Sequence, residues 1–255
     1  MRLILASLLL LAPLAGHAAD RCAFEAPRNL SVDLAGVRAV QIQVHSFDLH
    51  VTGRADAGKL DVRGRACASD RDMLDRLVVT QRREGDQLIL ELGNGRGVHW
   101  FGSGEAGLDV TVELPTNLPL TVEVGSGDAE VSGVGQLDSR VGSGDLNVRN
   151  VTGRFATRVG SGDVEAHDIG SLDLGSVGSG DFSASGIGGD ARVGSIGSGD
   201  VTLRNVRGSV HADTLGSGDL DVDGVGGDLS LGAKGSGDVS HNNVKGKVDV
   251  PRDDD

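Results

Sequence analysis

Apolar and polar residues alternate in short runs along most of this chain, most regularly after residue 120. The run Leu120-Thr121-Val122-Glu123-Val124 is typical, with every second residue apolar. A period of two indicates half-buried β-strands rather than helices. Such runs come in pairs separated by glycine-containing turns, so the pattern predicts an all-β fold of short strands.

The tetrapeptide Gly-Ser-Gly-Asp occurs seven times, and its aspartates are 17, 18, 18, 19, 19 and 19 residues apart. A strand rises ~3.3 Å per residue, so a unit of this length makes one flat coil of two strands. Such a coil buries its apolar side only against neighbouring coils, stacked by parallel pairing. We therefore predict a parallel β-helix, or β-solenoid, of about seven 17–19-residue coils over residues 121–250. Its glycines are expected to supply positive φ at the corners.

Residues 20–120 are expected to form a β-rich region that caps the solenoid. The runs at 77–80 and 88–92 flank Gly85 and Asp86 and predict a hairpin. A short helix is predicted from Ser69, because Asp72 stands three residues later as a capping signal. At the other end, the charged tail of residues 251–255 is expected to blunt the exposed strand edge.

Two features carry a resemblance to a known family. They are the lead-in Leu-Asp-Val-Thr-Val-Glu-Leu-Pro at 108–115 and the serial Gly-Ser-Gly-Asp-apolar-x-apolar units. With them the chain resembles exported bacterial β-solenoids of unknown function, known as putative auto-transporter adhesin head or GIN-type domains. The resemblance implies a right-handed parallel β-helix and an envelope or adhesion-like role, and it implies no known ligand.

The N-terminus has the features of a secretory signal peptide over residues 1–19. Arg2 supplies the positive charge, residues 3–14 are almost all apolar, and small residues precede Asp20. The apolar run is shorter than the ~20 residues that a membrane-spanning helix needs. An uncleaved membrane anchor is the alternative. The sequence thus predicts an exported protein, periplasmic or secreted, without a membrane span.

Cys22 and Cys67 are the two cysteines of the chain. An even count in an exported protein predicts a disulfide. Closing a loop of about 45 residues, it would contribute roughly 3–4 kcal/mol in the chain-entropy model. The alternative is metal coordination by the thiolates, although neither has the closely spaced partner that is typical of a zinc site.

Composition and charge narrow the choice of partners. The chain has 41 glycines, no tyrosine and one tryptophan, and its formal net charge is −13. With so few aromatic residues the core must be a thin layer of small aliphatic side chains. The acidity argues against nucleic acid and anionic membranes as partners and favours cations, basic proteins or simple solubility. The expected partner is an envelope protein or a glycan.

The aspartates of the repeats are the first candidate functional residues. In register, each would lie ~4.8 Å from the next, and in water each adjacent pair would repel by about 0.9 kcal/mol. Hydrogen bonds from backbone amides of the same turn would offset this, which is the preferred reading, without a cofactor. Calcium bound between coils is the alternative, although six to eight oxygen ligands are needed. The ladder comprises Asp128, Asp145, Asp163, Asp181, Asp200, Asp219 and Asp238.

Trp100 and Phe101, in a glycine-rich loop, are expected to plug the open end of the solenoid, because a thin stack needs an apolar lid. The alternative is that they contact a partner. Arginines in the repeats could form rows along the strand faces, namely Arg140, Arg149, Arg158, Arg192 and Arg204. The carboxylates are near-identical copies, whereas an active site is singular, and no serine stands in a nucleophile elbow. The preferred function is a non-enzymatic envelope scaffold or adhesin-like module. A calcium-binding module and a polysaccharide-binding or -cleaving β-helix are the alternatives.

Overall fold

The structure, a computed structural model, describes residues 22–93 and 105–251. The predicted signal peptide, Trp100, Phe101 and residues 252–255 lie outside the described residues.

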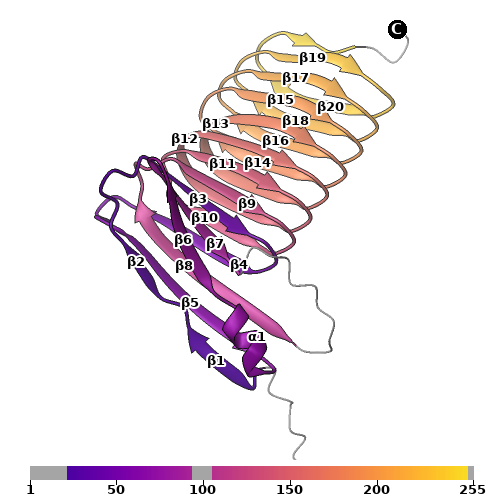
Figure 1. Cartoon of the computed structure of the whole chain (residues 1–255). Coiled ribbons are helices and arrows are strands. Elements are labelled where there is room, and N and C mark those ends of the chain that lie inside the picture. Colours follow the sequence, from indigo (N-terminus) through magenta and orange to yellow (C-terminus); the bar gives the residue numbers. More distant parts are fainter. Residues whose placement is uncertain (1–21, 94–104, 252–255) are drawn as a thin grey trace, which may run out of the picture.

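The repeat region forms a parallel β-solenoid, as predicted, in which each strand pairs with its counterpart in the next coil (Figure 1). Leu220 lies opposite Val239, for example, and Val210 opposite Leu229. In β12 and β13 the two strands of a coil are continuous. The strands are β9 (Leu120–Val124), β10 (Ala129–Ser132), β11 (Leu137–Val141), β12 (Leu146–Val159), β13 (Val164–Val177), β14 (Phe182–Ile187), β15 (Ala191–Ile196), β16 (Val201–Val206), β17 (Val210–Leu215), β18 (Leu220–Val225), β19 (Leu229–Lys234), β20 (Val239–Val244) and β21 (Val248–Asp249).

These strands make two sheets that enclose the core. The post-aspartate sheet contains the strands that follow each repeat aspartate, which are β10, the first halves of β12 and β13, β14, β16, β18 and β20. The pre-aspartate sheet contains β9, β11, the second halves of β12 and β13, β15, β17, β19 and β21. Strand alternation turns one set of side chains into the thin space between the sheets and the other set to solvent.

Parallel stacking continues into the region before residue 120, but in a different order from the sequence. Strands β3 (Ala39–Val44) and β4 (Asp48–Arg54) form a coil that pairs with β9 and β10 on one side. On its other side the same coil pairs with β7 (Gln87–Leu92) and β8 (Ala106–Pro115). The coil of β3 and β4 therefore lies between two coils that come later in the chain.

Antiparallel strands close the stack at its N-terminal end. Strand β5 (Leu60–Ala68) pairs with β8, and β6 (Val79–Glu84) pairs with β7 as the predicted hairpin. The far edge of β5 is covered by β1 (Phe24–Pro27) and β2 (Leu30–Val32). None of the described strands pairs with the other edge of β6, and its charged side chains Arg82, Arg83 and Glu84 protect that edge against pairing with other chains.

A short helix, α1 (Arg71–Arg76), packs beside β5 and β1 at this end. Its N-cap is Asp70, whose side chain accepts a hydrogen bond from the amide of Met73 at 2.8 Å. The cap is thus one residue later than the predicted Ser69, because the Asp70 carboxylate is the group that faces the free amides of the first turn.

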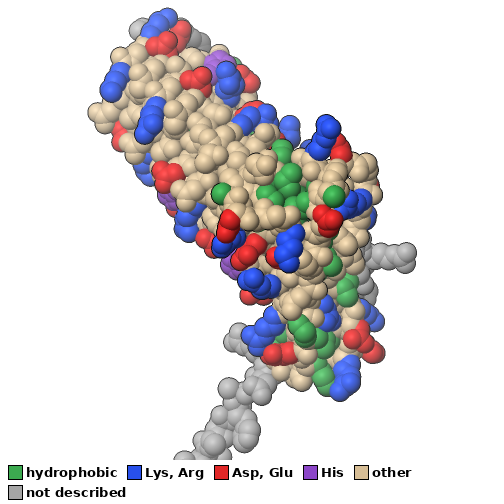
Figure 2. Space-filling view, turned by 90° about the vertical axis from the view of Figure 1, so that its left-hand side faces the viewer, with side chains coloured by type: hydrophobic (Ala, Val, Ile, Leu, Met, Phe, Trp, Pro, Cys, Tyr) green, Lys and Arg blue, Asp and Glu red, His purple; other side chains and the backbone are tan. Residues whose placement is uncertain are grey.

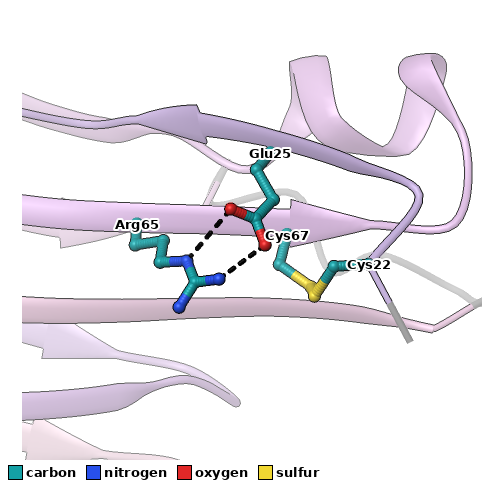
Figure 3. The surroundings of a disulfide bond; sticks show 4 residues. All are labelled: Cys22, Glu25, Arg65 and Cys67. Carbon is teal, nitrogen blue, oxygen red and sulfur yellow. Dashed lines mark hydrogen bonds and ion pairs between the residues drawn. A yellow bond between two sulfur atoms is a disulfide. The ribbon is translucent and has the colours of Figure 1, made fainter. Parts of the chain in front are cut away.

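Cys22 and Cys67 form the predicted disulfide, with their Cα atoms 5.2 Å apart (Figure 3). It fixes the segment before β1 to the end of β5. Beside it, Glu25 of β1 and Arg65 of β5 form an ion pair, and this contact raises the pKa of Arg65 above its ordinary value. The disulfide and the ion pair together hold β1 against the sheet edge that it covers.

The glycines of the Gly-Ser-Gly-Asp turns are required by the closeness of adjacent coils, and the expectation of positive φ there is wrong. None of these glycines has a positive φ. A Cβ at Gly180 would lie 2.7 Å from the carbonyl carbon of Ser161 and 2.8 Å from that of Gly162, in the coil before. Positive φ occurs instead at the corner five residues after each aspartate, at Gly133, Asn150, Asp168, Gly186, Asn205, Gly224 and Asn243. Glycine, asparagine and aspartate are the residues that adopt this conformation most readily.

Candidate functional site

The repeat aspartates form the predicted ladder, and their carboxylates are hydrogen-bonded to the next coil. The Oδ1 atom of Asp181, for example, accepts a hydrogen bond from the amide of Asp200 at 3.0 Å. The same bond joins every consecutive pair from Asp128 to Asp238, at 2.9–3.3 Å. The expected acceptor role is therefore confirmed, but the donor is the amide of the neighbouring coil and not one of the same turn. Each bond links two coils as well as offsetting the repulsion between carboxylates.

A shorter ladder of the same kind runs along the opposite turn. The Oδ1 atom of Asp190 accepts from the amide of Ser209 at 2.9 Å, and the Ser209 hydroxyl accepts from the amide of Asp228 at 3.1 Å. Asp228 in turn accepts from the amide of Lys247 at 2.7 Å. In these later coils, side-chain oxygens thus link both turns to the adjacent coil by hydrogen bonds.

The geometry gives the calcium alternative no support. Among residues 22–93 and 105–251, no three His, Cys, Asp or Glu side chains are placed to hold a metal ion together. A groove of about 480 Å³ follows the ladder past Asp145, Asp163, Asp181 and Asp200. One oxygen of each of these carboxylates is already engaged with a backbone amide.

Changing Asp181 to asparagine is expected to leave the free energy of unfolding within about 0.5 kcal/mol of the wild type, because the amide oxygen still accepts from Asp200. Changing Asp181 to alanine removes the acceptor and is expected to cost about 1 kcal/mol. Urea denaturation followed by circular dichroism, in EDTA and in millimolar calcium, measures both. A wild-type midpoint that rises with calcium, and does not rise in Asp181→Asn, would instead make the ladder a metal site.

The five arginines of the predicted rows lie in three different rows. Arg140 and Arg158 are opposite one another on the pre-aspartate sheet, whereas Arg192 of the same sheet stands in the row of Asp173. Arg149 and Arg204 belong to one row of the post-aspartate sheet, separated by two coils. Only Arg140 and Arg158 are therefore brought directly together.

A groove of about 380 Å³ opens around this pair on the pre-aspartate sheet, and we call it the arginine groove. Ala156 and Gly175 are its smallest lining side chains, and the longer side chains of Arg140, Arg154 and Arg158 stand around them. A Cβ at Gly175 would lie 3.1 Å from Cγ and Nε of Arg158, so the glycine leaves space for that side chain. The lining is completed by Gln41, Gln87, Thr121, Glu123, Asp138, Ser139, Thr157 and Asp173.

Among the described residues, ion pairing in the arginine groove leaves one arginine without a partner. Arg154 bridges two carboxylates, Asp138 at 3.1 Å and Asp173 at 3.7 Å. Arg140 pairs with Glu123 at 3.2 Å. No described residue forms an ion pair or a hydrogen bond with the exposed guanidinium of Arg158. The groove holds three guanidinium and three carboxylate groups. Because Arg154 pairs with two of the carboxylates, none of the three is left to pair with Arg158.

A buried polar contact forms part of the lining of the groove. Ser139 and Thr157 occupy inward positions and are 4% and 3% exposed. The Ser139 hydroxyl donates to the Thr157 hydroxyl at 2.7 Å, which provides each buried oxygen with a partner. Their inward phase in the alternation and their spacing of one coil, 18 residues, were the available signals.

The remaining candidates are scattered. His45 and His50 are in different segments and pair with Glu91 and Glu130, respectively. His241 stands opposite the inward Val222, yet it is exposed, since none of the described strands pairs with β20 on its other side. The predicted contacts Trp100 and Phe101 lie outside the described residues.

Charges of both signs are mixed on the face of the molecule shown in Figure 2. On the side shown in Figure 2, acidic and basic side chains alternate along the molecule, and most of the visible apolar side chains lie toward the N-terminal half. Within the described ranges, none of the helices has the length and apolarity to cross a membrane.

Comparison with known proteins finds a matching family and similar solved structures. The model of the family described as "Putative auto-transporter adhesin, head GIN domain" matches residues 44–244. A search of curated proteins finds no match. Among solved structures, a putative adhesin from Bacteroides fragilis NCTC 9343 is similar with a TM-score of 0.57 and 19% identity, over 87% of this chain and 99% of that one. A putative lipid binding protein from Parabacteroides distasonis ATCC 8503 has a TM-score of 0.50 and 16% identity, over 89% and 97%. At these identities the two structures support the fold alone.

Proposed function

The chain belongs to the family of putative auto-transporter adhesin head GIN domains, and from this premise we propose that it is an exported, adhesin-like interaction module without enzymatic activity. Its partner lies in the cell envelope or outside the cell. The solenoid serves as a rigid scaffold that displays polar side chains from two flat sheets. The signal peptide predicted over residues 1–19 provides the route of export.

The arginine groove is the observation that carries this proposal. It lies on an otherwise regular sheet surface, and residues of six strands, β3, β7, β9, β11, β12 and β13, line it. Side chains on sheet strands are held by their register, so a site of this kind is preorganised for binding. Its volume of about 380 Å³ is within the ~300–1,000 Å³ typical of small-ligand sites.

The repeated carboxylates support a structural role more than a catalytic one. Six consecutive pairs make the same amide contact, so none of the seven aspartates differs from its neighbours in the way a catalytic acid or base does. Calcium binding and polysaccharide cleavage gain no support from the family or from the similar structures.

Binding of the labelled, purified protein to intact bacterial cells and to their envelope fraction tests the proposal. We expect saturable binding that unlabelled protein competes away and that heat-unfolded protein does not show. N-terminal sequencing of the protein recovered from outside the cytoplasm is expected to begin at residue 20. Absence of saturable binding to any envelope or cell surface would contradict the adhesin-like role, and retention in the cytoplasm would contradict export.

A further inference from the structure

Two cations of the arginine groove face each other in register. Arg140 and Arg158 are directly opposite on β11 and β12 and project to the same side of the sheet. Like charges directly opposite on adjacent strands repel each other. Glu123 neutralises Arg140 from one side, at 3.2 Å, whereas no described carboxylate performs this for Arg158. The two guanidinium groups therefore have one carboxylate partner between them, and one positive charge is left unpaired.

An anion held between Arg140 and Arg158 would supply that charge. A guanidinium is planar and presents paired N–H donors that match a carboxylate, sulfate or phosphate group. Arg140 and Arg158 are both exposed, so an incoming anion would not have to displace a buried partner. In a chain with a formal charge of −13, a guanidinium without an acidic partner is a specific local attraction for an anion.

The rest of the lining indicates what carries the anion. Around the charged groups the groove presents the side-chain amides of Gln41 and Gln87 and the hydroxyl of Thr121, which can donate and accept hydrogen bonds. Ala156 is its largest apolar lining side chain. A peptide partner normally anchors through a large apolar or aromatic side chain in an apolar pocket, and this groove offers none. A hydroxyl-rich molecule with one acidic group matches the lining better.

We propose that the arginine groove binds an acidic saccharide, with the carboxylate of a uronate unit between Arg140 and Arg158 and the sugar hydroxyls on Gln41, Gln87 and Thr121. This inference rests on the proposed adhesin-like function and specifies its ligand class. Because none of the described residues that line the groove is aromatic, this part of the chain offers no platform for a sugar ring. The charge is therefore essential, and neutral sugars are expected not to bind.

Calorimetric titration of the purified protein with oligogalacturonate tests the inference, with the methyl-esterified oligomer as a ligand control of the same ring structure without charge. We expect binding of the acidic oligomer only, weakened about tenfold or more by Arg158→Ala. The matched protein control is Arg207→Ala, which removes an exposed arginine that has no described partner and lies outside the groove. It is expected to leave the affinity unchanged. Removal of Arg158 also relieves the repulsion with Arg140, so the variant is expected to melt no lower than the wild type.

Several outcomes would overturn the acidic-saccharide assignment. Equal weakening by Arg158→Ala and Arg207→Ala would indicate unspecific attraction of an anion. Equal binding of the esterified oligomer would show that the carboxylate is not recognised, and tighter binding of a glutamate-rich peptide would indicate a protein partner. Failure to bind any acidic oligomer, together with saturable binding to cells, would refute this inference and leave the adhesin-like function standing. Failure of both would refute the function as well.

Discussion

Replacement of Gly180 by alanine is expected to lower the free energy of unfolding by about 3 kcal/mol or more, since overpacking against backbone cannot be relieved by a side-chain movement. The added Cβ would lie 2.7 Å from the carbonyl carbon of Ser161 and would overlap the carbonyl oxygen of Gly162. Both contacts are with the preceding coil, so relief requires the two coils to separate. Such separation stretches the hydrogen bond that the amide of Asp181 donates to Oδ1 of Asp163 in the preceding coil, so the damage is expected to begin locally.

Urea denaturation followed by circular dichroism measures this effect, and two controls separate it from a general effect of alanine. At Gly58 a Cβ meets nothing within 4 Å, so Gly58→Ala is expected to change stability by less than about 0.5 kcal/mol. Ser179→Ala changes an exposed side chain in the same turn as Gly180 and is expected to be equally mild. If Gly180→Ala were as stable as Gly58→Ala, the coils would have to be farther apart at this corner than the structure places them.

Truncation of Phe155 to alanine is expected to cost about 3–5 kcal/mol, the usual range for a fully buried phenylalanine. Phe155 has no exposed surface, and its ring centroid lies 6.5 Å from that of Phe182, which is also buried. These two rings are the largest fully buried side chains of the core. The β-sheets on both sides are held in place by hydrogen bonds between coils, so the cavity left by the ring can collapse only in part.

Phe155→Leu is the matched control for this variant. Leucine already occupies the equivalent position in both adjacent coils, at Leu137 and Leu172, so it fits the local geometry. It is expected to cost less than about 1.5 kcal/mol. Thermal and urea unfolding of both variants gives the comparison, and similar losses for alanine and leucine would mean that the ring, and not the filled volume, supports this part of the stack.

The two effects bear on function through the arginine groove. Phe155 lies on the same strand as Arg154 and Arg158, and Gly180 belongs to the turn that follows β13, the strand of Asp173 and Gly175. Because the groove is assembled from adjacent coils, a local opening of the stack moves its charged groups apart. We therefore expect Gly180→Ala to weaken ligand binding as well as stability, whereas Phe155→Leu is expected to preserve both.

The repeat architecture could be predicted from the sequence because its contacts are periodic. One coil separates partners by 17 to 19 residues, so the same spacing that recurs in the aspartates also sets which strands pair. The inward apolar positions, including Phe155 and Phe182, and the disulfide between Cys22 and Cys67 follow from alternation and from cysteine count. These features depend on local patterns of residues, which can be read directly from the sequence.

The order of the first coils was decided by the tertiary structure. Strands β3 and β4 lie between coils that are formed later in the chain, and no local pattern specifies such an insertion. One signal was present in retrospect. His45-Ser46-Phe47-Asp48 stands in the register of the first Gly-Ser-Gly-Asp unit and is followed by the same apolar phase, at Leu49 and Val51.

The arginine groove also emerged only in three dimensions. The coils that begin at Asp145 and Asp163 both have 18 residues, yet the structure shifts their register twice, once between Val151 and Arg154 and once between Thr157 and Arg158. The equal length hides these shifts, because an extra residue in one part of a coil is balanced by an extra residue in another part of the next.

The sequence by itself therefore determined the strand periodicity, the stacking of equivalent turns and the residues that face the core, since these follow from alternation and from a constant repeat length. Only the tertiary structure decided the place of β3 and β4, the donor to each ladder carboxylate, and the lack of an acidic partner for Arg158 among the described residues. Those features depend on which atoms of neighbouring coils are in contact. A shift of one residue in register changes these contacts without changing the pattern of residues along the chain.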